Sequence, residues 1–536
     1  MKTLYYNGTV YTGEDFVEAF IVEDDRFIFA GSKKEAEEKI NSDDEKVDLR
    51  RQFVCAGFND SHMHLVNFGQ TMLMARLSEH TDSLTSLLGY ILEFKYKNNL
   101  HKNAWLRGRG WNQDYFSDVK RMPDRYDIDK VIDDIPVVLT RACGHCCVVN
   151  SKALELCGIT EDTVSPEGGA IGKTNGKLNG LFFDNAIDLI TRNIPSPGKA
   201  TIKKMILSAC KKLNSYGITS SQSDDYCVFR ELPYSIIDES YRELEKEGKL
   251  TVRVNEQCNF TELKDLKKFI ADGNMTGKGT KMFRTGPLKM LGDGSLGGRT
   301  AYLSKPYADD ESTSGFPLFS SREMNQMIDY ANENGMQVAV HAIGDKCLDQ
   351  VMNAIDKALK KNPREDHRHG IVHCQISRAD QLKRIENMHL HVYAQSIFLD
   401  YDNHIVEDRV GKKLASTSYS WKTLLNNGVV VSNGSDAPVE LPDVLKGIQC
   451  AVTRKSMDGF GPYLPEEAFT VREAIDSFTI NGAIASFEED VKGKIKEGYY
   501  ADFVILNHDP FNCDENTIAS IKVKKTFVGG KCVYER

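Results

Sequence analysis

Two histidines, His62 and His64, end a segment that starts apolar and becomes polar, as a buried strand leaving a sheet would. Side chains two positions apart on a strand share one face, so the two imidazoles can converge on one metal ion. On a helix they would diverge. Taken alone, such a pair is more often two strand histidines satisfied by hydrogen bonds, so the interpretation depends on further ligands downstream.

Further potential ligands lie at the ends of other expected strands. His341 and His373 end two strands about one βαβ repeat apart, and Asp436 follows the last expected strand. Active sites of α/β barrels lie at the carboxyl ends of the strands, so these side chains would meet there. Imidazole suits zinc, whose softness is borderline. The pattern predicts up to two divalent ions per chain, with a preference for zinc.

Lys289 lies between Leu288 and Met290 in another expected strand. An unpaired ammonium is costly in a strand buried on both faces, and buried lysines lose their proton readily. A neutral Lys289 could react with carbon dioxide to form a carbamate whose two oxygens bridge two cations. A salt bridge to Asp293 explains the residue equally well, and the composition leaves both interpretations open.

Eight short apolar segments are expected strands, and charge-rich amphipathic stretches such as 321–334 and 345–361 separate several of them. A repeated β-then-α order favours a parallel sheet, and eight units favour a (β/α)₈ TIM-like barrel in the α/β class. The expected strands are 53–65, 217–222, 251–256, 287–291, 337–341, 370–373, 391–395 and 429–433.

Two regions fall outside the barrel pattern. Residues 1–55 and 490–536 contain short strand signals with glycine-rich turns, including a hairpin-like signal at 5–8, and predict one small β-sandwich domain built from both termini. The barrel would then span 56–489. Residues 66–215 lie between its first two strands and predict an insertion that roofs the barrel mouth.

Composition narrows the functional classes. The net charge of −9 and pI near 5.9 give no basic patch for nucleic acid or an anionic membrane. The first residues lack the apolar core of a signal peptide, and thirteen scattered cysteines favour reduced thiols, so a cytoplasmic protein is expected. Cys143 and Cys146 have zinc-knuckle spacing, but the second pair that a structural zinc site needs is missing.

The order of these residues resembles the amidohydrolase superfamily, with His-x-His after the first strand, Lys in the fourth, His after the fifth and sixth, and Asp after the eighth. Longer segments are similar to its YtcJ-like branch, which includes N-substituted formamide deformylases. These segments are 57–64, 289–301, 340–345 and 493–503. The resemblance covers nearly the whole chain.

The resemblance implies a two-metal hydrolase, most often with zinc, that attacks carbon–nitrogen bonds outside peptides in a small-molecule substrate. It implies His62, His64 and Asp436 as ligands of one metal, His341 and His373 as ligands of the other, and carboxylated Lys289 as the bridge. Asp436 would also be the catalytic residue that moves the proton of a metal-activated water.

The resemblance also places Trp111 and His145 near the substrate. Asn112 stands where an Asp is expected, and Asp184 stands where Glu is commoner. These departures prevent the substrate of any characterised member from being carried over to this chain.

Three alternatives remain open from the sequence. A single-metal deaminase of the same superfamily would use most of the same histidines but would lack the bridging Lys289. A non-catalytic binding barrel would have lost one or more ligands, and none is lost. A glycoside hydrolase with paired acids such as Asp293 and Asp436 would leave the histidines unexplained. The oligomeric state, including a homo-oligomer, is also open.

Overall fold

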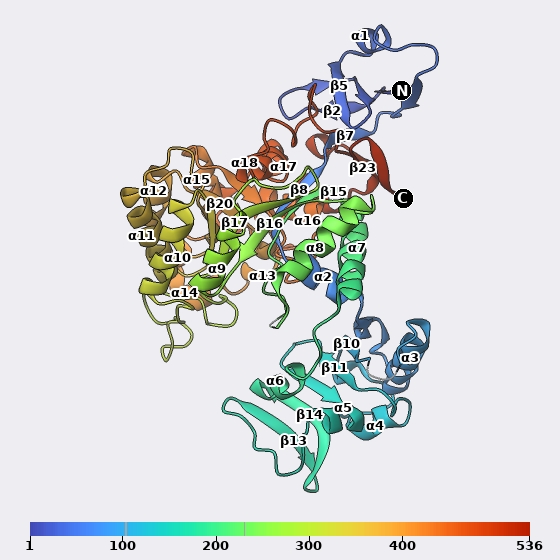
Figure 1. Cartoon of the computed structure of the whole chain (residues 1–536), viewed down its shortest axis with the longest axis vertical. Helices are drawn as coiled ribbons and strands as arrows, with labels where there is room; N and C mark the ends of the chain where they lie inside the picture. Colours follow the sequence, from blue (N-terminus) through green and yellow to red (C-terminus); the bar gives the residue numbers. More distant parts are fainter. Residues whose placement is uncertain (102–103, 230) are drawn as a thin grey trace. The chain divides into compact units, whose positions relative to one another are not determined.

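The computed structural model describes residues 1–536 apart from 102, 103 and 230. The chain divides into two compact units. Residues 1–69 and 199–536 form one of them, here called the barrel unit, and residues 70–198 form the second unit. The colours of Figure 1 follow both units along the sequence.

An eight-stranded sheet lies at the centre of the barrel unit, and every neighbouring pair of its strands is parallel (Figure 1). Its strands follow one another in sequence order, which confirms the predicted (β/α)₈ architecture. They are β8 (Phe58–Met63), β15 (Ile218–Ser223), β16 (Arg253–Asn259), β17 (Phe283–Leu291), β18 (Val338–Ala342), β19 (Gly370–His373), β20 (His391–Ala394) and β21 (Val431–Asn433).

The barrel nearly closes between β8 and β21, the two ends of this sheet. The chain that follows β21 makes the connection: the Asp436 amide donates to the His62 carbonyl over 2.8 Å, and the His64 amide donates to the Ala437 carbonyl over 2.8 Å. The Ser435 hydroxyl donates to the Asp60 carboxylate over 2.5 Å. These bonds join the first and last barrel strands at their carboxyl ends.

Amphipathic helices follow most barrel strands. In α11 (Asp345–Lys361) the buried positions Leu348, Val351, Met352 and Ile355 recur at helical spacing, as expected for a helix that packs on a sheet. The helices of this unit between β8 and the end of the barrel are α2 (Leu65–Met72, which continues into the second unit), α7 (Lys199–Ser215), α8 (Tyr234–Lys246), α9 (Leu263–Ala271), α10 (Ser321–Glu333), α11, α12 (Ala379–Asn387), α13 (Leu399–Asp402), α14 (Val406–Ala415), α15 (Trp421–Asn426), α16 (Val444–Thr453), α17 (Val471–Ser477) and α18 (Ile480–Ala485).

Two small sheets are built from the chain ends. One contains β5 (Arg26–Gly31), β4 (Ala19–Glu23), β1 (Lys2–Tyr6) and β6 (Glu45–Asp48), and the short helix α1 (Lys33–Glu37) packs on it. The other joins both termini in the order β24 (Lys531–Glu535), β23 (Val523–Val528), β22 (Phe503–Leu506), β7 (Phe53–Ala56), β2 (Thr9–Tyr11) and β3 (Phe16–Val17). In this sheet β22 lies between β23 and β7, so strands from opposite ends of the sequence pair with each other (Figure 1).

Two details of the predicted strands are wrong. The segment 53–65 is not one strand, because β7 pairs with β22 in a terminal sheet whereas β8 pairs with β15 in the barrel. Gly57 separates them, and a Cβ atom there would lie 2.3 Å from the Thr219 side chain, so only glycine fits. The hairpin-like signal at 5–8 is not a hairpin either, since β1 and β2 belong to different sheets.

The second unit contains a six-stranded sheet in the order β13 (Gly169–Thr174), β14 (Lys177–Asp184), β12 (Cys146–Val149), β11 (Val137–Arg141), β10 (Leu106–Trp111) and β9 (Ala75–Arg76). Its helices are α3 (Leu84–Lys97), α4 (Arg125–Asp129), α5 (Ser151–Leu156) and α6 (Asp188–Thr191). The second unit spans residues 70–198, which is a shorter range than the predicted 66–215 insertion. The difference arises mainly because α7 contacts β15 and β23 of the barrel unit. The expectation that it roofs the barrel mouth stays a prediction.

Within the described part of the chain, every helix is too short or too polar to cross a lipid bilayer.

A buried ion pair joins the barrel to the terminal β domain, and it gives the first prediction. The Arg253 guanidinium on β16 donates to both Asp502 carboxylate oxygens, over 2.6 and 2.9 Å, and lies 4.0 Å from the Tyr500 ring centroid. Asp502→Ala would leave the buried guanidinium without its counter-charge. We expect this change to destabilise the protein by about 3–5 kcal/mol, as equilibrium denaturation would measure.

The matched control is Asp356→Ala, which removes the exposed ion pair with Lys360. Exposed pairs contribute about 0–1 kcal/mol, so the control should lower stability by at most that amount. Equal effects of the two changes would contradict the structural role given to Asp502.

Candidate metal centre

His62 and His64 lie at the carboxyl end of β8, and hydrogen bonds fix which nitrogen of each ring is free. The Gln257 amide donates its N–H to the Ser61 carbonyl, so its oxygen faces His62 and accepts from His62 Nδ1 over 2.7 Å. His64 Nδ1 donates to the Asp224 backbone carbonyl over 3.1 Å. Both histidines therefore carry the proton on Nδ1 and turn Nε2 toward the barrel mouth.

Asp436 meets these two nitrogens from the chain that follows β21. Its Oδ1 lies 3.1 Å from His64 Nε2 and 3.4 Å from His62 Nε2. Ligand atoms around a tetrahedral zinc ion, each about 2.0 Å from the metal, are about 3.3 Å apart. The two distances to Asp436 match this spacing, and all three ligand atoms lie within 4.8 Å of one another.

His341 on β18 and His373 on β19 lie next to this group. Their ring centroids are 4.4 Å apart, and the His373 ring is 5.8 Å from that of His62. His341 Nε2 donates to the Gly294 carbonyl over 3.1 Å, which leaves its Nδ1 as the free nitrogen. The buried His373 Nδ1 has no hydrogen-bond partner.

Two of these residues have strained backbone. His373 has φ of 77° and Asp436 has φ of 58°, both in the left-handed region that costs a non-glycine residue about 1–3 kcal/mol. The Trp421 indole stabilises the conformation of His373 by donating to the His373 carbonyl. The bond from the Asp436 amide to the His62 carbonyl stabilises that of Asp436. Strain of this kind clusters at functional sites, where the required direction of a side chain justifies the free-energy cost of an unfavourable backbone conformation.

Lys289 is fully buried on β17, and its ion-pair partner differs from the one considered from the sequence. Its Nζ lies 3.3 Å from Asp224 Oδ2, at the end of β15. Asp293 is engaged elsewhere, accepting from the backbone amides of Ile343, Gly344 and Tyr302. The proposed Lys289–Asp293 pair is therefore wrong, because Asp293 anchors the loop after β18 instead.

Burial sets the protonation of the histidines. It lowers the pKa of His62 and His373 well below the usual value, and the Lys289 charge lowers both further, so both rings are neutral at pH 7. Burial also opposes charge on His64, but the contact with Asp436 and the Asp224 charge raise its pKa to about 9. Although burial favours protonated Asp436, His64 holds the pKa of that carboxyl below its usual range.

The residues at this barrel end fit divalent metal ions. Among the described residues, His62, His64 and Asp436 form a group whose ligand atoms lie within 4.8 Å of one another. His373 adds a buried nitrogen without a partner. The neutral His62 and His373 rings and the ionised Asp436 carboxylate are already in the forms that bind zinc, and His64 would release a proton on binding the metal. The donor set suits that ion or a similar one.

Three polar residues of the site were missed from the sequence. Asp60 shares a face of β8 with His62 and accepts from Ser435, so strand alternation could have identified it. Asp224 follows β15, and the strand-end criterion would have found it if applied to the second strand. Gln257 on β16 carries no charge, and no sequence signal marks it as the partner of His62.

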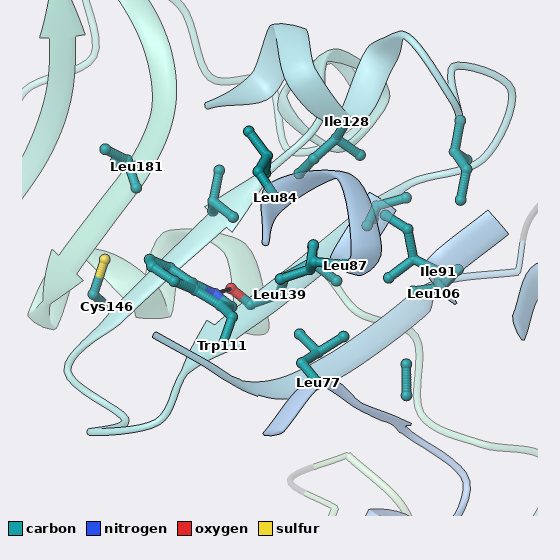
Figure 2. Close-up of a cluster of buried hydrophobic side chains, with 14 of the residues drawn as sticks. Leu77, Leu84, Leu87, Ile91, Leu106, Trp111, Ile128, Leu139, Cys146 and Leu181 are labelled. Atoms are coloured by element: carbon teal, nitrogen blue, oxygen red, sulfur yellow. Dashed lines mark hydrogen bonds between the residues drawn. The ribbon is translucent and has the colours of Figure 1, made fainter. Parts of the chain in front are cut away.

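Trp111 and His145 belong to the second unit. Trp111 is fully buried in a hydrophobic core, where its indole donates to the Leu139 carbonyl over 2.8 Å (Figure 2). A substrate could contact it only if this core opened. His145 is exposed, and its Nδ1 contacts Asp184 over 3.0 Å. Cys143 and Cys146 are free thiols, and they do not belong to the metal-ligand group found among the described residues.

The sequence profile of the amidohydrolase family matches residues 45–534. The chain belongs to this family of metal-dependent hydrolases. A protein of Bacillus subtilis (strain 168) named "Putative amidohydrolase YtcJ" is 36% identical over 546 residues, which cover 100% of both chains. An N-substituted formamide deformylase of Arthrobacter pascens is 24% identical over 542 residues, covering 98% of this chain and 97% of that one.

A solved structure agrees with the family assignment. The crystal structure of an uncharacterized metal-dependent hydrolase from Pyrococcus furiosus superposes with a TM-score of 0.80 at 28% identity, covering 96% of this chain and all of the other. The amidohydrolase architecture is thus matched over nearly the whole length.

The second prediction concerns metal content. Elemental analysis of this amidohydrolase, purified after metal supplementation, should find up to two divalent ions per chain. His62→Ala should lower that content, because it removes one member of the converging group. His404→Ala is the control, since His404 belongs to the same unit but contacts Asp458 and Phe460 outside the site. Wild-type protein that stays metal-free, or a His62→Ala variant with unchanged content, would refute the metal centre.

Proposed function

We propose that this amidohydrolase-family protein hydrolyses a carbon–nitrogen bond of an amide or formamide type, outside peptides, in a small molecule. The observation that carries the proposal is the convergence of His62, His64 and Asp436 at the carboxyl end of the barrel, beside His341 and His373. The similarity to an N-substituted formamide deformylase supports the choice of bond.

The proposed ligands divide between two ions, with zinc as the preferred metal. His62, His64 and Asp436 would hold one ion, His341 and His373 would hold the other, and a carboxylated Lys289 would lie between them. When bound, such ions lower the pKa of a water molecule toward neutrality and polarise a substrate carbonyl. Gln257 and the Asp224 carbonyl keep the His62 and His64 rings in the required tautomer.

Asp436 is the proposed catalytic residue. Its carboxylate is ionised at neutral pH and lies at the barrel mouth, so it can accept a proton from the attacking water. The water oxygen forms the new bond to the carbonyl carbon as that proton moves to Asp436. Asp436 then returns the proton to the leaving nitrogen as the carbon–nitrogen bond breaks, which releases a carboxylic acid and an amine.

One observation keeps the single-metal deaminase as a second candidate. Lys289 Nζ lies 3.3 Å from Asp224 Oδ2, a contact that suits an unmodified, charged lysine. A lysine in that state would bridge no ions. The two candidates therefore differ in the covalent state of Lys289.

Two residues of the second unit are proposed to lie near the substrate. His145, exposed and paired with Asp184, is proposed to contact the substrate, and Trp111 would reach it only after a rearrangement of its core.

A cytoplasmic location is proposed as well. The free state of the chain's cysteines, some of them exposed, supports a reducing compartment.

The third prediction tests the reaction. Metal-loaded protein should release amines from a panel of N-formyl and N-acetyl amines, and it should leave dipeptides uncleaved. Asp436→Asn keeps the side-chain shape but removes the proton acceptor, so kcat/KM should fall at least about 100-fold. Released amine gives the rate. Release of ammonia from amino-substituted heterocycles, without amide cleavage, would instead favour the deaminase.

The fourth prediction concerns Lys289. If it is carboxylated, growth with ¹³C-labelled bicarbonate should give a carbamate signal in the NMR spectrum of the wild-type protein. Lys289→Ala should lose that signal, empty at least one metal position and abolish hydrolysis. A short-chain carboxylic acid should restore part of both properties, because it can supply the two bridging oxygens.

Lys289→Arg is the matched variant for this test. Guanidinium stays charged and forms no carbamate, so this variant should be inactive and should gain nothing from the added acid. An unmodified Lys289 paired with Asp224 beside a single metal would overturn the two-metal mechanism and favour the deaminase.

A further inference from the structure

A cavity of about 180 Å³ in the barrel unit opens beside the metal centre. Its walls come from segments that follow the proposed ligands: Ile343 comes two residues after His341, and Gln375 comes two residues after His373. Phe398 lines the cavity and stacks on the His373 ring, with 5.9 Å between centroids and 22° between planes. A molecule in the cavity would therefore border the reacting centre.

The cavity has an apolar wall. Leu296, Ile343 and Phe398 line it, and Leu296 and Ile343 are buried. Tyr401 and Val439 also line it, and 59% and 65% of their surfaces are exposed. Exposed apolar side chains around a concave apolar wall are typical of a ligand pocket. An aromatic or aliphatic ring would cover this surface.

One polar group in this wall lacks a partner. Gln375 is 1% exposed, and its amide nitrogen donates to Asp402 Oδ2 over 2.9 Å, where the Tyr419 hydroxyl also donates over 2.8 Å. Because the nitrogen must face this carboxylate, the orientation of the amide is fixed. The Gln375 oxygen is thereby left buried without a donor. An unpaired buried acceptor is unfavourable, and a ligand N–H or O–H would satisfy it.

The charged residues that line the cavity restrict the charge of a ligand. Asp402 and Glu440 are its ionisable acids, and the described residues that line the cavity include no Lys, Arg or His. The nearby Lys446 is paired with Asp400. An anionic group in the cavity would meet like charges without a counter-ion, so it is disfavoured.

We propose that this cavity holds the part of the substrate remote from the cleaved bond, and that Gln375 is a specificity-determining residue. The substrate class is an N-acyl amine whose ring carries a hydrogen-bond donor and no negative charge. Anionic N-acyl amino acids are excluded. This inference rests on the proposed function for the reaction, but the recognition itself is a binding property and can be tested separately.

The test uses methyl ketones in which a CH₂ group replaces the amide N–H, so that they bind without being hydrolysed. The probes are 4-(4-hydroxyphenyl)butan-2-one, its 4-methoxy counterpart and its 4-carboxy counterpart. Calorimetry on the metal-loaded full chain should find the hydroxy compound bound about five- to tenfold more tightly than the methoxy compound, the effect of one hydrogen bond. The carboxy compound should bind most weakly.

Gln375→Leu removes the acceptor at similar volume, so the hydroxy and methoxy ketones should then bind equally. Gln375→Met serves the same purpose if the leucine variant does not fold. Gln350→Leu is the matched control, because Gln350 donates to the Phe319 carbonyl outside the cavity, and it should keep the preference. An equal affinity of the wild type for both ketones, or a preference that survives the Gln375 changes, would overturn the inference.

The corresponding N-benzyl acetamides separate this inference from the reaction. If the ketones show the predicted preference but no acetamide or formamide is hydrolysed, the proposed function is wrong and the binding inference stands. If the acetamides are hydrolysed without any dependence on Gln375, the function stands and the specificity role is wrong.

Discussion

The site depends on closure of the barrel between its first and last strands. His62 and His64 end β8, and Asp436 follows β21, so the three side chains meet only because these two sheet ends are joined. The bond from the Asp436 amide to the His62 carbonyl and the bonds from Ser435 to Asp60 make that junction. They place two proposed ligands in direct backbone contact.

This junction also determines the electrostatics of the barrel mouth. Burial raises the pKa of Asp60 to about 7, with hydrogen bonds from Ser435 and His62 opposing the shift and the Asp436 charge adding to it. Burial keeps His62 and His373 neutral, while His64 and Asp436 form the charged pair. The same barrel end thus combines imidazole lone pairs, a carboxylate and a buried lysine, which are the groups that metal-dependent hydrolysis needs.

The barrel was predictable because most of its strands are short buried runs followed by a helix with regular apolar spacing. All eight strands were found, and 345–361 matches α11. The convergence of the strand-end histidines followed from the architecture alone. The pairing of Lys289 with Asp224 did not, because it depends on which neighbouring strand supplies the carboxylate. The division of 53–65 into two strands was missed because a change from apolar to polar residues is also expected of one strand that leaves a sheet, and only the sheet partners distinguish β7 from β8. Likewise, Trp111 gives no local signal that its indole is used inside a core.

The pairing of β7 with β22 has a consequence for synthesis of the chain. The ribosome releases β7 and β8 early, as one nearly continuous extended segment, whereas β22 is some 450 residues further along. Until the last residues emerge, β7 has β2 on one side and an open hydrogen-bonding edge on the other. Open apolar edges recruit other chains. Until β22 is made, the nascent protein therefore carries an unpaired strand edge next to the proposed ligands His62 and His64, and chaperone demand and sensitivity to premature termination should both be concentrated at this strand.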